Sequence, residues 1–501
     1  MPKRIFALII AALFILTLIA ACSSGDGEKT PGTGDPVDNN AVADAAETTE
    51  TPYIDQFANL DYDGEEVQVI AMSVPGANPS ISLEDNTGER IFDQLYQRDR
   101  EVEDLLNITI AYTEIADNVG DSMMLAEKMQ KAVMAGDCPW RFMLNRIAYG
   151  TAAIASSGTI IDMTTLPYFS PQEPWWNRNV YENMSYKGRL FFDTGSISLA
   201  YFYSPCILAY NQNLAESYGV NDIYDRVIGG TWTIDYFNEI IDGTAADLDG
   251  DGVMKETDQF GLAVDDLSSQ SFYIGIGGRN DMANEEGIPT LVVNKEENIT
   301  RVQKTLEVVG IKERTLYTEG LSGDSYTEKK TRTFKAGRAF FLGYNMSGLI
   351  DQLRDMDNDY GIIPLPKYDE AQERYYTYGS PFGPIGICVP TTNTVEQNEL
   401  TGAVIESMAY LAYTEVQPLM YDITLKEKVA RDERSKEMLD IIYEDIIYDW
   451  TQCLDPGGLN AVMRQLCTGA KQDPVSAITK IFDKAEAALK KVMDTYEGIE
   501  G

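Results

Sequence analysis

The sequence predicts an α/β fold in which helices lie on the faces of a parallel sheet. Residues 65–71 (EEVQVIA) alternate and then become continuously apolar, as a first strand would. Residues 91–106 follow with apolar side chains at helical spacing, and residues 107–112 (NITIAY) again favour a strand. This strand–helix–strand order implies parallel strands with a helix crossing one face of the sheet.

The N-terminus has the pattern of a lipoprotein signal peptide, which we assign to residues 1–21. Lys3 and Arg4 precede an apolar run, and small residues stand directly before Cys22 (Ile-Ala-Ala-Cys), as a lipoprotein signal peptidase requires. We therefore expect acylation of Cys22 and a lipid anchor on the outer face of the cell membrane; the alternative is an uncleaved transmembrane anchor. Residues 22–51 are rich in Gly, Asp, Ala, Thr and Pro and predict a disordered tether.

Composition excludes several functions. The 79 acidic and 40 basic residues give a net charge of −39, which disfavours nucleic acid and anionic lipid as partners. The chain has no histidine, so it holds neither a Ser-His-Asp triad nor a histidine-ligated zinc. It also lacks a P-loop, a G-x-S-x-G motif and a G-x-G-x-x-G motif. Chemistry by a pair of carboxylates stays open, because acidic residues are abundant.

The cysteines after Cys22 do not form a recognisable pattern. Their odd number and their spacing argue against a disulfide framework and a metal site. Buried free thiols are the simpler interpretation for most of them, although two are close enough in sequence to pair, Cys453 and Cys467. The five residues are Cys138, Cys206, Cys388, Cys453 and Cys467.

Residues 247–258 match an EF-hand-type calcium loop. Acidic residues occupy loop positions one, three and five, and Gly252 at position six allows the sharp turn. Lys255 at position nine cannot bind calcium, so a water or the next residue would complete the shell. A solvated acidic turn is the alternative. We predict one structural calcium ion, held by Asp247, Asp249, Asp251, the carbonyl of Val253, Glu256 and Asp258.

The same region carries a family resemblance. A Thr-Trp-Thr helix start at 231–233, the acidic loop and Asp-Gln-Phe-Gly at 258–261 resemble extracellular solute-binding proteins of bacterial ABC importers, of the carbohydrate type. Pro-Trp-Trp-Asn at 174–177, residues 360–368 and residues 428–442 are also similar to that family. The resemblance covers the chain from about residue 60, and it departs from the family in Lys255 and in the number of cysteines.

The resemblance implies a two-lobe, periplasmic-binding-protein-like α/β fold with crossing hinge strands and a ligand cleft between the lobes. It places residues 52–195 and about 361–420 in lobe 1, and residues 196–360 and about 421–501 in lobe 2. It implies a monomer that captures a sugar or oligosaccharide by lobe closure and delivers it to an ABC permease, without catalysis. A lipid-anchored glycoside hydrolase using two carboxylates and a peptide-binding lipoprotein remain alternatives.

Candidate ligand-binding residues stand at strand ends and in aromatic clusters. Ligands of open α/β sheets lie beyond the carboxyl ends of the strands, which selects Asn145 and Arg146 after one predicted strand and Tyr344 and Asn345 after another.

The aromatic candidates depend on the suitability of flat rings for stacking on sugars. One indole of Trp175 and Trp176 is expected to face the cleft, with interdomain packing of both as the alternative. Residues 198–210 are expected to be extended at the hinge, which would place Tyr201 and Tyr203 on one face, and Trp450 is a candidate roof of the cleft. Trp232 is expected to pack inside lobe 2.

Overall fold

The computed structural model describes residues 52–72, 81, 87–115, 119–318, 326–353, 355–421, 433–468 and 473–499. The predicted signal peptide, the tether and Cys22 lie outside these residues. In the part of the chain that is described, no helix has both the length and the apolar run needed to cross a bilayer.

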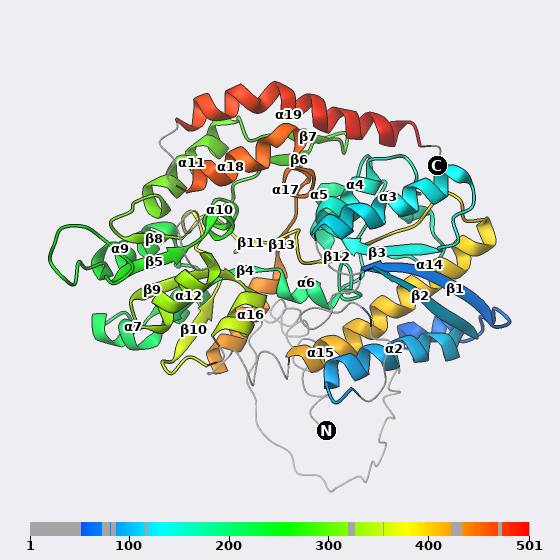
Figure 1. Cartoon of the computed structure of the whole chain (residues 1–501), viewed down its shortest axis with the longest axis horizontal. Helices are drawn as coiled ribbons and strands as arrows, with labels where there is room; N and C mark the ends of the chain where they lie inside the picture. The colour runs from blue at the N-terminus through cyan, green and yellow to red at the C-terminus, as the bar shows by residue number, and fades with distance from the viewer. Residues whose placement is uncertain are drawn as a thin grey trace, which may run out of the picture. The chain divides into compact units, whose positions relative to one another are not determined.

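The first sheet has the strand order β12-β3-β1-β2 (Figure 1). Its first three strands in sequence are parallel, and β12 joins β3 in the antiparallel sense. The strands are β1 (Glu65–Met72), β2 (Ile108–Ile115), β3 (Phe142–Arg146) and β12 (Ile385–Cys388). Helix α3 covers one face, and α2 and α14 cover the other (Figure 1). These helices are α2 (Arg90–Leu106), α3 (Val119–Ala135) and α14 (Val395–Leu411).

The second sheet has the order β10-β4-β9-β5-β8. The core β5 is parallel to β8 and β9, whereas β4 is antiparallel to both its neighbours. The strands are β4 (Cys206–Asn211), β5 (Phe260–Val264), β8 (Thr315–Tyr317), β9 (Ala339–Asn345) and β10 (Tyr360–Ile363).

Alternation along these strands supplies the cores on both faces of the second sheet, because successive side chains point to opposite sides. Leu208 and Tyr210 of β4 pack with α9 and α11, while Ile207 and Ala209 pack with α12, α13 and α16. The helices of this half are α7 (Gln212–Tyr218), α8 (Ile223–Ile228), α9 (Ile234–Thr244), α10 (Asp266–Gly275), α11 (Glu296–Val309), α12 (Tyr326–Lys335), α13 (Met346–Gln352) and α16 (Glu433–Glu444).

We call the two halves the first and the second lobe, each defined by its sheet and the helices that cover it. Three segments pass between the lobes side by side. They are the residues before β4, strand β11 (Thr377–Tyr378) and strand β13 (Ile446–Ile447). β11 is parallel to β13, and Pro205 forms a bridge with Gly379 next to it. The predicted crossing strands are therefore present.

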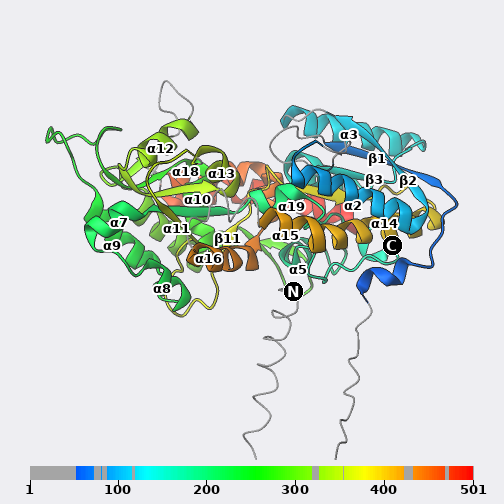
Figure 2. The same ribbon diagram turned by 90° about the horizontal axis from the view of Figure 1, so that it is seen from below.

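The C-terminal helices pack against both lobes (Figures 1 and 2). They are α17 (Trp450–Leu454), α18 (Leu459–Cys467) and α19 (Pro474–Glu497). Tyr496 of α19 stacks on Phe191 with ring centroids 4.0 Å apart, and α18 contacts α10. A small hairpin of β6 (Asp281–Ala283) and β7 (Pro289–Leu291) lies beside α19.

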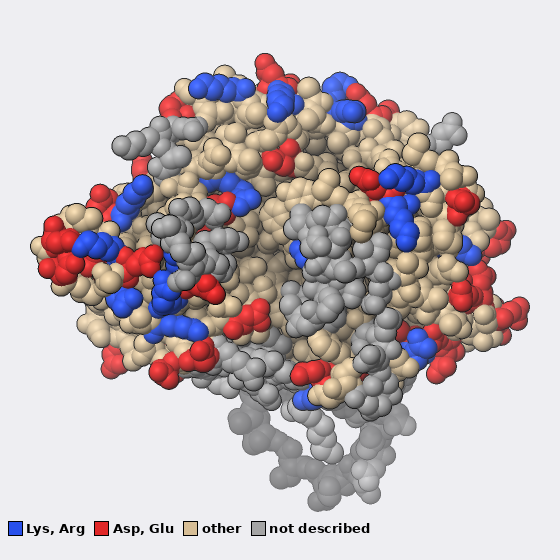
Figure 3. Space-filling model, viewed as in Figure 1, with Lys and Arg blue, Asp and Glu red and all other residues tan. Residues whose placement is uncertain are grey.

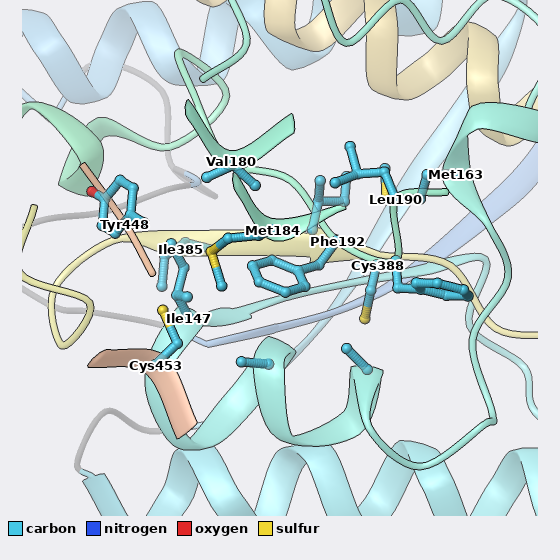
Figure 4. Close-up of a cluster of buried hydrophobic side chains, with 14 of the residues drawn as sticks. Ile147, Met163, Val180, Met184, Leu190, Phe192, Ile385, Cys388, Tyr448 and Cys453 are labelled. Atoms are coloured by element: carbon cyan, nitrogen blue, oxygen red, sulfur yellow. The ribbon is translucent and has the colours of Figure 1, made fainter. Parts of the chain in front are cut away.

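The remaining described elements are short. They are η1 (Tyr53–Phe57), η2 (Ile147–Thr151), α4 (Ala152–Ala155), η3 (Met163–Thr165), α5 (Arg178–Met184), α6 (Leu199–Tyr203), η4 (Ala412–Val416), α15 (Gln417–Met420) and η6 (Pro456–Gly458). Figure 4 shows how several of them contribute to the first core, where Ile147, Met184, Phe192, Ile385 and Cys453 pack together from separate segments.

Two expectations about secondary structure are wrong. Residues 188–195 form isolated bridges rather than a strand. Residues 199–203 form helix α6 rather than an extended segment, because Leu199 and Phe202, three residues apart, both bury their side chains in one cluster. Trp232 is fully buried in the second lobe, as predicted.

Candidate functional site

A cavity of about 480 Å³ lies where the strand ends of the two sheets face each other. Arg146 reaches it from the end of β3, and Tyr344 and Asn345 reach it from the end of β9. The structure thus brings together three predicted residues that lie about 200 positions apart in the sequence. The cavity is lined by Arg146, Cys206, Asp265, Asp266, Leu267, Ser268, Tyr344, Asn345, Ser347, Gly348, Asp351, Gln352, Ser380, Phe382, Gly383 and Arg464.

The wall from the first lobe is held by Arg146. Its guanidinium donates a hydrogen bond to the carbonyl of Phe382, in the loop before β12. The ring of Phe382 lies 5.8 Å from that of Tyr149, which is 41% exposed. Tyr149 has φ +63°, a conformation that is costly for an aromatic residue. A strained, exposed ring therefore stands next to the cavity.

The wall from the second lobe is built around a buried ion pair. The Lys330 ammonium lies 2.5 Å from Asp265 Oδ2, donates to the carbonyl of Gly343 at 3.0 Å, and sits 3.8 Å from the ring centre of Tyr344. Burial alone would raise the pKa of Asp265, but Lys330 and the capping bonds from Ser268 outweigh it and lower that pKa. Asp265 is therefore an ionised acceptor at the cavity wall.

Asn345 has a structural role as well as a place in the cavity. Its side-chain oxygen accepts from Gly348 N at 3.1 Å and so caps α13. Its amide nitrogen is the part that remains for a ligand.

Asn145 does not line this cavity. It is fully buried, donates to the carbonyl of Ser122 at 2.9 Å and accepts from the backbone N–H of Arg146 at 2.8 Å. Asn145 therefore shapes the end of β3, and only its neighbour reaches the cavity.

The two adjacent tryptophans are packed in the first lobe. Trp175 and Trp176 are 4% and 5% exposed. Their indole N–H groups donate to the two carboxylate oxygens of Glu406 at 2.9 and 3.0 Å. Glu406 also accepts from Tyr53 and Ser170, yet burial outweighs these bonds and raises its pKa to about 7. The structure does not support the expectation that one indole presents its face to the ligand cleft, because a buried carboxylate needs both donors.

The other aromatic candidates also lie outside the cavity. The Tyr201 hydroxyl accepts from Asn177 at 3.0 Å, and Tyr203 packs against the cluster that α6 buries. Trp450 is fully buried, with its ring 5.9 Å from that of Phe192, so it does not roof the cleft. A second cavity, of about 380 Å³, is lined by Trp176 and Tyr201 among others.

Sequence reasoning missed Asp265 and Phe382. Asp265 directly follows β5, so the rule that selected Asn345 could also have found it. Phe382 lies in a loop (Ser-Pro-Phe-Gly-Pro) with no periodic signal, and only the fold brings it to Arg146.

In the predicted calcium loop, carboxylate oxygens of Asp247, Asp249 and Asp258 lie within 4.8 Å of one another. Asp247 accepts from the backbone N–H groups of Gly250 and Gly252 at 2.8 and 2.7 Å, which gives the loop its tight turn. Three acidic residues therefore converge, as an EF-hand-type loop requires.

The other predicted ligands fit calcium less well. The Lys255 ammonium contacts Asp251 and lies 3.1 Å from Asp249 Oδ2, where it competes with a cation. Glu256 pairs with Lys329 and Arg332 instead of turning into the loop. Many of the acidic side chains on the face shown in Figure 3 gather over α9 and this loop.

All five cysteines in the described part of the chain are free thiols, including Cys453 and Cys467. Four of them are buried, and Cys138 is half-buried.

No family model matches the chain, and no curated protein matches it in sequence. Solved structures do match it. The ABC substrate-binding protein Lmo0181 from Listeria monocytogenes in complex with cycloalternan is 17% identical, with a TM-score of 0.50 over 86% of this chain and 100% of that one. Mycobacterium tuberculosis UspC is 15% identical, with a TM-score of 0.54 over 84% of this chain and 100% of that one.

The cyclic alpha-maltosyl-1,6-maltose binding protein from Arthrobacter globiformis is 13% identical, with a TM-score of 0.54 over 86% of this chain and 99% of that one. The chain therefore has the two-lobe α/β fold of ABC-transporter substrate-binding proteins, and the predicted fold class is confirmed.

Proposed function

We propose that this protein captures a sugar or oligosaccharide between its two lobes and delivers it to an ABC permease. The observation that carries the proposal is the polar cavity of about 480 Å³ between the strand ends of two sheets that crossing strands connect. Related folds with printed sugar ligands, such as the cycloalternan complex, support the same solute class.

Binding would proceed by hinge bending. A solute that contacts Arg146 on one wall and Asp265 or Asn345 on the other gains both sets of contacts only when the lobes approach each other. It therefore favours the closed state by its differential affinity for that state. Paired charges and amide groups suit the hydroxyl groups of a neutral sugar, which both donate and accept hydrogen bonds.

The setting of the protein is part of the proposal. Acylation of Cys22 would anchor a monomer to the outer face of the membrane, and residues 22–51 would let it reach the permease. A labelled lipid precursor should be incorporated into the full chain and not into Cys22→Ser.

The first test is a thermal-shift screen of residues 52–501 against monosaccharides and oligosaccharides. A ligand that binds only the folded state raises the melting temperature by mass action. We expect a shift with one sugar class and recovery of the sugar intact. A screen positive only with peptides would replace the solute class. Consumption of the sugar would favour the two-carboxylate hydrolase.

The cavity residues can be tested separately with the identified sugar. Arg146→Ala should weaken binding by about 1–3 kcal/mol, because a charged hydrogen-bond donor is lost from one wall. Arg434→Ala on α16, outside the cavity lining, is the matched control and should leave the calorimetric affinity unchanged. Equal affinities for the two variants would show that this cavity is not the binding site.

We also propose that residues 247–258 bind one calcium ion that stabilises the second lobe, supported by the three converging carboxylates. Calcium should raise the melting temperature of the chelated protein, and Asp249→Ala should abolish that rise. Lys255→Ala should strengthen it, because a competing ammonium is removed. A melting temperature that calcium does not change in either the wild type or Lys255→Ala would refute the site.

A further inference from the structure

A buried polar cluster lies where the crossing strand β13 leads into α17. It contains Asn280 and Asp281 at the start of β6 and Asp449 and Gln452 at the start of α17. None of these four residues is more than 2% exposed. Two carboxyl groups in one buried cluster repel each other strongly if both are ionised, so their protonation has to be explained by their partners.

Asp281 has partners that fix it as a carboxylate. Its two oxygens accept from the backbone N–H groups of Trp450 at 3.1 Å and Thr451 at 2.8 Å, and from the Thr451 hydroxyl at 2.6 Å. A backbone N–H can only donate, so neither Asp281 oxygen is placed to carry a proton toward an acceptor.

Asp449 has partners of a different kind. Its Oδ1 accepts from the backbone N–H of Gln452 at 2.7 Å, which caps α17. Its Oδ2 faces two side-chain amides, Asn280 at 3.0 Å and Gln452 at 3.2 Å. A side-chain amide can turn over within the same envelope and exchange its donor for its acceptor.

Both amides have an oxygen without a partner. Asn280 Oδ1 and Gln452 Oε1 are buried and accept no hydrogen bond. Such an orphaned buried acceptor costs about 1–3 kcal/mol. If Asp449 Oδ2 carries a proton and one amide is turned, that proton is donated to the amide oxygen, and one orphan is satisfied.

The other charged and titratable groups around Asp449 do not neutralise it. Arg279 faces it, but its guanidinium donates to the carbonyls of Ile274 at 3.4 Å and Gly278 at 2.8 Å and lies 4.3 Å from the ring centre of Tyr376. The remaining groups that interact with Asp449 are acids: Asp281, Tyr273, Tyr378 and Cys453.

We propose that Asp449 is protonated at neutral pH, that it donates this proton from Oδ2 to the side-chain oxygen of Asn280 or Gln452, and that Asp281 remains ionised. Because Asp449 joins β13 to α17, the proton makes the packing of α17 between the lobes sensitive to alkaline pH. Burial, followed by repulsion from Asp281, raises the pKa of Asp449 well above its usual range, in agreement with this assignment.

The sign of the pH effect follows from this assignment. The native state holds a proton that the unfolded chain releases near pH 4. The associated stability is therefore complete below about pH 4 and is lost as pH rises through the native pKa. The melting temperature of the wild type should fall by several degrees between neutral and alkaline pH.

The test compares Asp449→Asn with Asp281→Asn over that pH range. An amide at position 449 reproduces the protonated acid, so Asp449→Asn should fold and its melting temperature should change less with pH. Asp281→Asn sets an NH₂ group against backbone N–H groups, so it should lose stability at every pH. Parallel pH profiles of the wild type and Asp449→Asn would overturn the proposal.

Infrared spectroscopy gives a readout that does not depend on stability. The difference spectrum of wild type minus Asp449→Asn at neutral pH should contain the carbonyl band of a protonated carboxyl group. Carboxylate bands in its place would contradict the assignment. So would a metal ion, found by elemental analysis at one per protein after chelation, that Asp449→Asn removes.

Discussion

Buried acidic residues in this protein are each explained by a specific set of donors. Glu406 is the clearest case, since Trp175, Trp176, Tyr53 and Ser170 all donate to its carboxyl group. The adjacent tryptophans are therefore paired with one carboxylate across more than 200 residues of sequence. At this scale the indole N–H groups, rather than the ring faces, explain the motif.

A prediction follows for these tryptophans. Trp175→Phe or Trp176→Phe should lower the free energy of unfolding by about 1.5–3 kcal/mol, because a bond to a buried charged group is lost. Sugar affinity should not change. Trp232→Phe is the matched control, since its N–H donates at 3.0 Å to a neutral carbonyl, that of Pro364, and should cost less. Calorimetry and denaturant melts measure both; a loss of affinity without a loss of stability would return the tryptophans to the ligand site.

Among the elements, α19 depends on one close approach of the backbone. Gly457 has φ +63°, and a Cβ atom there would lie 2.8 Å from the backbone nitrogen of Ala485 in α19. Gly458 has φ +94° but open space around its Cβ position. Only the first glycine is needed for helix packing, whereas both are needed for the turn.

The two glycines therefore form a matched pair of variants. Gly458→Ala should destabilise the protein by about 1–2 kcal/mol through backbone strain alone. Gly457→Ala should cost at least about 1 kcal/mol more, because α19 has to shift. Hydrogen exchange should show the extra loss in α19 itself. Equal costs for the two variants would mean that α19 adapts to the added methyl group.

For the whole molecule, the dominant electrostatic fact is the net charge of −39. Mutual repulsion of surface carboxylates opposes the compact state, and salt screens it. The buried pair of Lys330 and Asp265 is screened much less.

Adding sodium chloride to a solution of low ionic strength should therefore raise the melting temperature. Choline chloride at equal ionic strength, with a chelator present, should give the same increase and so exclude specific binding of sodium or calcium. A melting temperature that falls with salt would show that surface ion pairs outweigh the net repulsion.

The sequence by itself determined the order of the elements and the strand ends that carry Arg146, Tyr344 and Asn345. Local periodicity was sufficient for this, because the amphipathic patterns of α2, α9 and α19 and the apolar strands β1 and β9 reflect only which face is buried. Sheet topology then places strand ends together by a general rule.

Only the tertiary structure decided which aromatic residues are core and which polar groups meet. Glu406 meets its two indoles, Phe382 meets Arg146, and Asp281 meets Asp449 through contacts between distant segments. Helix α6 was mistaken for a strand for the same reason, since the cluster that it buries is formed by other elements. A local pattern shows that a side chain will be buried, but its partner is fixed by how the whole chain folds.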